Sequence, residues 1–247
     1  MKLAGAHVLL TGGGRGLGRH MAERLASDGA QVWVLERDET LCTELRAAGL
    51  HVLACDATDP AAVDASLQAA EAQGATFAVL VNNAGLIHSE PLVNMLSRGE
   101  RAHSRDSWRT VLGANLDSVF YVTSRVVDRM MAQRIKGVVI SVSSIAAQGN
   151  AGQSAYSAAK AGVNALTRSW AKELGPLGYR FAAVAPGFID TPSTRAALSE
   201  AIVDQLEKKI PLRRLGEPES VYLAVRHVIE NDYLNGIVLD VDGGLTL

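Results

Sequence analysis

The sequence predicts a doubly wound α/β fold: one domain, residues 1–247, with about seven parallel strands flanked by helices. Short apolar runs alternate with helical patterns from one end of the chain to the other, which indicates βαβ units. The runs are continuously apolar, as is typical of parallel strands that are covered on both faces. No repeat, linker or low-complexity segment divides the chain, so we expect one sheet.

In the first half of the chain, glycine and proline mark the ends of the expected helices. Gly29 and Gly49 follow two of them, as C-terminal glycines often do. Asp59 is the expected N-cap of a third helix, with Pro60 as its first residue. The expected strands are 7–12, 31–36, 51–56 and 77–85, and the expected helices are 18–30, 38–48 and 59–74.

In the second half, the expected helices are longer and two connections are unusually long. Residues 86–105 and 188–217 exceed ordinary connections, and the second carries some helical pattern. Both follow strand ends, where ligands bind in open α/β sheets, so we expect an insertion at 86–105 and a substrate loop at 188–217. The expected strands are 137–144, 180–187 and 236–244, and the expected helices are 106–134, 154–175 and 218–231.

The composition argues against several classes of partner. A formal net charge of -2 gives no basic excess for nucleic acid or an anionic membrane, and 5% aromatic residues are too few for base stacking. Cys42 and Cys55 cannot build a disulfide framework or a Cys-rich metal site, so we expect no metal. We find no signal-peptide core and no run of ~20 apolar residues, so the expected location is the cytoplasm.

The stretch TGGGRGLG, residues 11–18, lies between the first expected strand and the first expected helix. Gly12, Gly16 and Gly18 allow a tight turn and let the backbone approach a pyrophosphate at the helix N-terminus. A simple strand-to-helix turn is the alternative, because a glycine pattern alone is weak. Glu36 ends the second strand, at the distance expected for a carboxylate that binds ribose, which favours a dinucleotide site.

The form of the dinucleotide depends on the charges near Glu36. Its carboxylate would accept hydrogen bonds from the ribose hydroxyls of NAD and repel a 2′-phosphate, so we predict NAD. Arg15 and Arg37 lie near the same position and would attract that phosphate, so NADP is the alternative. Asp56 ends the third strand and has two equal interpretations, as a cap of the next turn or as a ligand of the adenine edge.

Tyr156 and Lys160 lie four residues apart in SAYSAAKAG, residues 154–162, and therefore share one face of a helix. An ammonium beside a phenol favours the phenolate and lowers its pKa, which makes proton transfer easier near neutral pH. The donors of a lysine can also bind ribose hydroxyls. A surface pair on a stable helix is the alternative.

Three further polar residues are candidates for catalysis. Ser143 and Ser144 end the fifth strand, where a hydroxyl would hold a substrate oxygen near the phenol, although turn formation is the commoner role of such serines. Asn115 lies inside the long helix, where an amide is mildly unfavourable. A functional Asn115 would hold a water that relays protons toward Lys160.

From end to end, the chain resembles a short-chain dehydrogenase/reductase. The matching pieces are TGGGRGLG, NNAG (82–85), Asn115, a serine before the loop, YSAAK (156–160), and PG (186–187) followed by Thr191. The resemblance implies a Rossmann fold and reversible hydride transfer between a nicotinamide cofactor and a secondary alcohol or ketone. It makes Tyr156 the general acid/base, Asn115 the holder of the relay water, and Lys160 the residue that lowers the Tyr156 pKa and binds the nicotinamide ribose. The residues it places along the cofactor are Gly12, Arg15, Gly16, Leu17, Gly18, Glu36, Asp56, Ala57, Asn83, Ala84, Gly85, Tyr156, Lys160, Pro186, Gly187, Ile189 and Thr191.

The family serine, which stabilises the substrate oxygen, aligns in two ways. The usual twelve residues between serine and tyrosine select Ser143. The strand pattern of ISVSS selects Ser144, with one residue deleted from the following loop. Because a one-residue slip turns every side chain of a strand to the other face, we predict Ser144.

The substrate is predicted by resemblance alone. The C-terminal stretch HVIENDYLNGIVLDVDGG and the 86–105 insertion are similar to 3-hydroxyacyl-CoA dehydrogenases, which favours a 3-hydroxyacyl or 3-oxoacyl thioester. NADPH-dependent 3-oxoacyl carrier-protein reductases are the alternative, on the likeness of NAGQSAYSAAKAG. Their acidic partner calls for a basic face, and Asp128 stands where such reductases place an arginine.

Two further expectations concern activity and assembly. A nucleotide-sensing protein without activity is the non-enzyme alternative, but such proteins usually lose the tyrosine or the lysine, and this chain has both. The family usually forms tetramers through the two long helices. We therefore expect a homotetramer, with Met130, Leu166 and Trp170 available for burial; the core of one subunit is the alternative role of these three residues.

Overall fold

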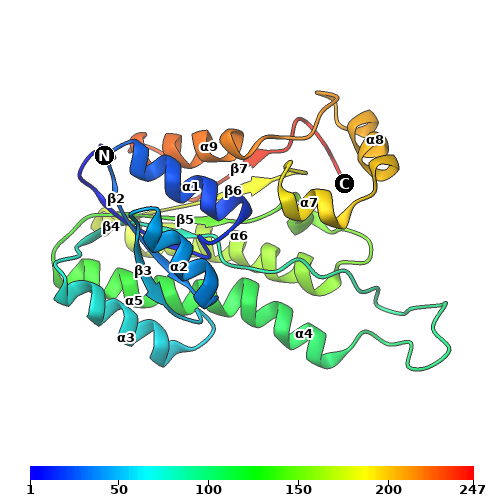
Figure 1. Cartoon of the computed structure of the whole chain (residues 1–247), viewed down its shortest axis with the longest axis horizontal. Coiled ribbons are helices and arrows are strands. Elements are labelled where there is room, and N and C mark those ends of the chain that lie inside the picture. Colours follow the sequence, from blue (N-terminus) through cyan, green and yellow to red (C-terminus); the bar gives the residue numbers. More distant parts are fainter.

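The computed structural model describes residues 1–247, apart from the side chains of Ser193 and Ala197. Across the described residues, seven parallel strands form one sheet in the order β3-β2-β1-β4-β5-β6-β7 (Figure 1). This confirms the predicted fold class, a single doubly wound domain. The strands are β1 (His7–Thr11), β2 (Gln31–Glu36), β3 (His51–Ala54), β4 (Phe77–Asn82), β5 (Val138–Val142), β6 (Arg180–Pro186) and β7 (Ile237–Val241).

Helices cover both faces of the sheet and bury its apolar side chains in two clusters. Figure 1 shows α1 (Gly16–Ser27) and α9 (Pro218–Glu230) on one side, and α3 (Pro60–Ala72) and α5 (Ser118–Ala132) on the other. The first cluster also contains Leu45 of α2 (Glu39–Ala47), and the second contains Ala171 of α6 (Ser154–Leu174). Burial on both faces explains why the strands are continuously apolar.

The order of the strands reverses at β1, which pairs with β2 on one side and β4 on the other, so that later strands are added in the opposite direction. The connections after β1 and β4 therefore leave toward opposite faces of the sheet. Ligands of open α/β sheets bind in the crevice at this reversal, at the carboxyl ends of the strands. The glycine loop follows β1 and the NNAG stretch follows β4, so both lie at this crevice.

The long helix predicted over 106–134 has the right extent but is not one regular helix. It consists of α4 (Arg105–Leu112), a π-helical turn over Gly113–Asp117, and α5. A π turn holds one more residue than an α turn and is frequent at functional sites. Asn115 lies in this turn and is fully buried.

The two long connections differ in structure. Residues 188–217 contain two helices, α7 (Pro192–Ala197) and α8 (Glu200–Lys209), in line with the helical pattern expected there. Residues 86–105 extend beyond the body of the molecule before α4 (Figure 1), and we call residues 86–104 the arm. Its paired positions are isolated bridges, Glu90 with Gln153 and Val93 with Ala102. No helix among the described residues is long and apolar enough to cross a membrane.

One partly buried cation, Arg180, holds β6 to the end of α9 and the segment that follows it. The Arg180 guanidinium donates hydrogen bonds of 2.8–3.2 Å to four carbonyl oxygens. These carbonyls lie at the helix C-terminus and just beyond it, where backbone N–H donors are scarce; Asn231 O also accepts one, from Leu234 N at 3.3 Å. They belong to Val228, Ile229, Asn231 and Leu234.

Candidate active site

Close approach of the backbone explains the glycines after β1. Gly12 and Gly16 have φ of +67° and +53°, in the left-handed region that favours glycine. A Cβ atom on Gly18 would lie 2.0 Å from the carbonyl oxygen of Gly12 and 2.5 Å from Nδ2 of Asn83. The loop therefore folds tightly against the start of α1. The first N–H groups of a helix have no partner within it, so those of α1 could bind a phosphate.

Glu36 lies at the end of β2, and its carboxylate holds the glycine loop. Oε2 accepts a hydrogen bond from Gly14 N at 3.0 Å, and Oε1 accepts from Arg37 N at 2.9 Å and Asp38 N at 3.2 Å. A carboxylate has about four acceptor positions, so one remains for a ribose hydroxyl. Glu36 thus links the loop that would cradle a pyrophosphate to the place where a ribose would lie.

The NNAG stretch is fixed to the glycine loop through a residue that the sequence reading missed. The Thr11 hydroxyl is buried and accepts hydrogen bonds from Asn83 N at 3.1 Å and Ala84 N at 3.0 Å. Asn83 Nδ2 donates to Gly12 O at 2.7 Å. A Cβ atom on Gly12 would come within 2.8 Å of the Ala84 Cα, so the two loops touch. A threonine at the end of β1 was the only sequence signal for this contact.

The other predicted cofactor residues also follow the ends of strands. Asp56 forms the turn after β3 by accepting hydrogen bonds from Thr58, which hold the pKa of the Asp56 carboxyl below its usual range. Exposed Arg37 lies 3.8 Å from this carboxylate. The predicted residues that stand elsewhere at this edge are exposed Arg15 and partly buried Leu17 at the start of α1, Ala57 after β3, and Pro186, Gly187, Ile189 and Thr191 at the end of β6 and just beyond it.

Tyr156 lies in the first turn of α6 and is 8% exposed. Burial raises the pKa of its phenol, and a hydrogen bond with Ser144 opposes this effect. Ser144 caps the 3₁₀ turn after β5 by accepting from Ala146 N. Ser143 points away from the phenol, and its hydroxyl lies 3.4 Å from the Lys160 carbonyl. The structure thus brings Ser144, not Ser143, to the tyrosine.

The predicted effect of Lys160 on Tyr156 differs from what the structure shows. Lys160 Nζ donates to Val142 O at 2.8 Å and lies 5.7 Å from the centroid of the phenol ring. Burial lowers the pKa of this ammonium to about 8, because a charged group is costly in a low-dielectric interior. The expectation that Lys160 lowers the Tyr156 pKa is wrong for this structure, in which burial raises that pKa and the group that opposes the rise is Ser144.

Asn115 approaches Lys160 from the π turn. Its Nδ2 donates to Leu86 O at 2.9 Å and Val111 O at 3.0 Å, while its buried Oδ1 has no hydrogen-bond partner. A Cβ atom on Gly85 would lie 2.5 Å from this Oδ1 and 3.8 Å from Lys160 Nζ. A buried acceptor beside a buried lysine suits a bound water, since unpaired buried oxygens are costly.

The glycine loop, Glu36 and the NNAG stretch fit a dinucleotide, and a proton-transfer group lies on the neighbouring helix. Such an arrangement defines a nicotinamide-dependent oxidoreductase. The comparisons agree: a family model described as enoyl-(acyl carrier protein) reductase matches residues 12–246. The chain belongs to the short-chain dehydrogenase/reductase family, whose members act on CH–OH groups.

Relatives and solved structures share the fold along its whole length. The chain is 34% identical to a (3R)-3-hydroxyacyl-CoA dehydrogenase of Canis lupus familiaris, over 99% of this chain and 98% of the relative. It is 35% identical to a 3-oxoacyl-[acyl-carrier-protein] reductase of Thermotoga maritima, over 100% of both chains. The solved 3-oxoacyl-[acyl-carrier protein] reductase of Brucella melitensis is 29% identical, with a TM-score of 0.86 over 100% of this chain and 93% of its own.

Proposed function

We propose that this enzyme interconverts a secondary alcohol and a ketone on a 3-hydroxyacyl or 3-oxoacyl thioester, with Tyr156 as the general acid/base. The observation that carries the proposal is the contact between Ser144 and the buried phenol of Tyr156 at the carboxyl edge of the sheet. A substrate oxygen placed between the two hydroxyls would receive hydrogen bonds from both. The nicotinamide cofactor supplies or accepts the hydride.

The raised pKa of Tyr156 favours one direction near neutral pH. The phenol keeps its proton there and can give it to the oxygen of a ketone, which is what reduction requires. Oxidation of an alcohol requires the phenolate, so we expect its rate to rise with pH while the rate of reduction does not. Lys160, Asn115 and a water at the free Asn115 Oδ1 would return the proton from solvent.

We propose NAD as the cofactor because Glu36 stands at the end of β2 with one acceptor position free for a ribose hydroxyl. Replacing Glu36 with Gln keeps the size of the side chain and removes its negative charge. The ratio of kcat/KM for NADH to that for NADPH should then fall. An unchanged ratio would contradict this assignment and indicate that Arg15 and Arg37 select the cofactor.

A coenzyme A thioester is favoured over a carrier-protein thioester by the ion pairs of α5. Arg125 pairs with Asp64 at 3.2 Å, and Arg129 lies 3.6 Å from Asp64 and 3.4 Å from Glu71. These arginines are already neutralised by α3, so they offer little to an acidic partner protein. The carrier-protein reductase is kept as the second candidate because several relatives have that name.

We also propose a homotetramer that forms through α5 and α6. Met130 is 1% exposed and belongs to the core of this chain, the alternative that the sequence left open for it. Phe120 is 48% exposed on α5, with its ring 6.5 Å from that of Trp170 on α6. Light scattering of the wild type and of Phe120→Asp tests this assembly, and an unchanged mass would contradict it. The cytoplasmic location stays a prediction.

The test of function is an initial-rate assay by nicotinamide absorbance. NADH and NADPH are each offered acetoacetyl-CoA, acetoacetyl-N-acetylcysteamine, a keto-steroid and crotonyl-CoA, the last because the family model is named for an enoyl reductase. We expect turnover of the 3-oxoacyl thioesters, lost in Tyr156→Phe with NADH binding retained. Turnover retained in Tyr156→Phe, or restricted to crotonyl-CoA, would refute the proposal.

A further inference from the structure

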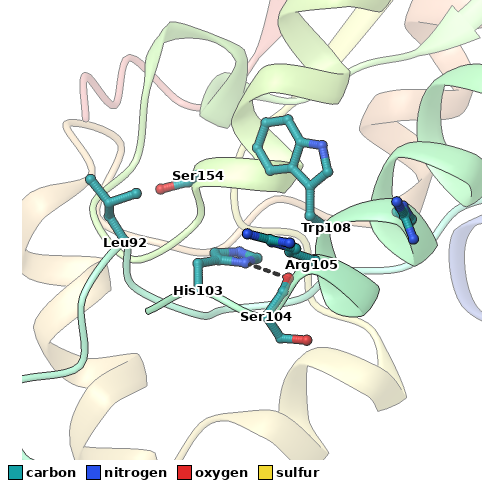
Figure 2. Close-up of a pocket in the computed structure, with 7 residues that line it drawn as sticks. Leu92, His103, Ser104, Arg105, Trp108 and Ser154 are labelled. Carbon is teal, nitrogen blue, oxygen red and sulfur yellow. Dashed lines mark hydrogen bonds between the residues drawn. The ribbon is translucent and has the colours of Figure 1, made fainter. Parts of the chain in front are cut away.

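A cavity of about 470 Å³ lies between the arm and the first turns of α4 and α6 (Figure 2). Its size is in the range of small-molecule sites. Figure 2 shows Trp108 and Arg105 of α4 beside His103, with Leu92 and Ser154 across the space. The cavity is lined by Leu92, His103, Ser104, Arg105, Trp108, Arg109 and Ser154.

Two cations of this cavity have no ion-pair partner among the residues that the structure describes. Arg105 and Arg109 are one helical turn apart on α4 and line the same space. Within the described part of the chain, neither guanidinium takes part in an ion pair. The nearby carboxylate of Glu90 is held elsewhere, by Ser104 N at 2.7 Å and His88 Nε2 at 3.0 Å. The cavity therefore has unneutralised positive charge.

A buried histidine adds a second observation. The His103 side chain is 8% exposed, and its Nδ1 lies 2.9 Å from Ser104 O and 3.7 Å from Glu90. Both neighbours are acceptors, so Nδ1 carries the proton and donates. Nε2 has no hydrogen-bond partner among the described residues, and in the neutral ring it is an acceptor, available to a donor group of a ligand in the cavity. Trp108 is 39% exposed and offers an aromatic surface beside the arginines.

The cavity lies next to the catalytic tyrosine. Ser154, which lines it, precedes Tyr156 by two residues, about 3 Å along the axis of α6. On α4, Val111 follows Trp108 by three residues and packs in one apolar cluster with Tyr156 and Leu86. The bridge between Glu90 and Gln153 holds the arm beside the loop that precedes α6. A long, flexible substrate can therefore reach from the cavity to the phenol.

From this placement, and resting on the proposed function, we propose that the cavity binds the nucleotide phosphates of an acyl-CoA substrate. Arg105 and Arg109 hold the phosphate oxygens, and Trp108 offers its ring to the adenine. The pantetheine arm then runs past Ser154 and brings the thioester to Tyr156. The arginine pair thus determines specificity by binding the CoA part of the substrate, and it does not contact the reacting carbon.

The kinetic test compares a substrate that has the phosphates with one that lacks them. In Arg105→Gln/Arg109→Gln, we expect the KM for acetoacetyl-CoA to rise at least about tenfold with kcat little changed, because two charge-assisted contacts are lost. The KM for acetoacetyl-N-acetylcysteamine should not change. The control is Arg46→Gln, which removes an exposed cation on α2, outside the proposed α5–α6 interface, and should leave both KM values unchanged. Equal changes for both substrates, or no change, would overturn the proposal.

A binding test separates failure of this site from failure of the proposed reaction. Calorimetry with CoA itself, at saturating NAD so that the cofactor site is filled, measures the cavity without any turnover. The wild type should bind CoA, and the double arginine variant should bind it at least about tenfold more weakly. If no thioester is turned over but CoA binding depends on the arginines, the reaction is wrong and the site stands. If CoA binds both proteins alike, the site is wrong whatever the reaction.

Discussion

Replacing Lys160 with Met should stabilise the protein at neutral pH and abolish its activity. Lys160 is 4% exposed, and its buried ammonium faces a single carbonyl oxygen, that of Val142. Methionine has a similar length and no charge, so the variant removes the cost of burying the ammonium. The same change removes the group proposed to bind the ribose and relay the proton.

The size of the effect follows from the lysine pKa. A shift from 10.5 to about 8 means that the charged form is disfavoured by about 3 kcal/mol in the folded state. The variant leaves Val142 O unpaired, which costs about 1–3 kcal/mol, so the net gain at pH 7 is about 1 kcal/mol. Between pH 8 and 10.5 the unfolded wild type binds more protons than the folded one, so wild-type stability rises with pH. Above that window both states carry a neutral lysine, and the wild type becomes the more stable protein.

The assay is urea unfolding of wild type and Lys160→Met at pH 7, 8.5 and 10. The difference in free energy of unfolding should move by about 2–3 kcal/mol toward the wild type across this range. Lys172→Met is the matched control, since Lys172 is exposed on the same helix and its replacement should give a difference that does not change with pH. A pH-independent difference for Lys160→Met would refute the reasoning, because the lysine would then not be buried in its charged form.

Three further substitutions test the site and the fold. Ser144→Ala should lower kcat by about 100-fold with NADH binding intact, whereas Ser143→Ala should change it less than about threefold; comparable losses would show that register does not select the serine. Arg180→Met should lower the free energy of unfolding by at least about 3 kcal/mol in urea titrations, because three carbonyl oxygens lose their side-chain donor and a fourth, Asn231 O, keeps only Leu234 N; a loss under about 1 kcal/mol would mean that water replaces the guanidinium. Gly18→Ala should abolish NADH binding in a fluorescence titration, since its Cβ would lie 2.0 Å from Gly12 O, and normal affinity would show that the loop adapts.

Much of the fold could be predicted because the local signals agree with one another. The strand 31–36 has the predicted bounds, and Asp59 with Pro60 starts α3 as expected, since its side chain accepts from Ala61 N. The glycines that have no room for a Cβ atom and the acid at the end of β2 could also be recognised, because each is part of a short local motif. The choice of Ser144 came from strand register, which sequence patterns record well.

The rest depends on contacts between distant segments. The Lys160 side chain points to Val142 O, to which its ammonium donates a hydrogen bond. The sequence around Lys160 does not predict that contact. Arg105 and Arg109 have helical spacing, but only the folded arm makes their surroundings a cavity. The position of Met130 in the helix is compatible with a core residue or an interface residue, and only tertiary packing shows that it belongs to the core. Such properties become visible once the neighbours across space are known.

The π turn adds one residue to the sequence of the helix, and this can be tested by deleting single codons. One residue is accommodated in Gly113–Asp117 beyond what an α-helix would hold, so Val119 stands effectively seven positions after Val111, about two turns. Both side chains are buried, as this phase shift allows. Removal of one codon within 113–117 would restore a straight helix and keep the two faces in phase, but Asn115 would no longer stand beside Lys160. A library of single-codon deletions across α4 and α5 should therefore yield folded, inactive proteins at this turn and unfolded ones on either side.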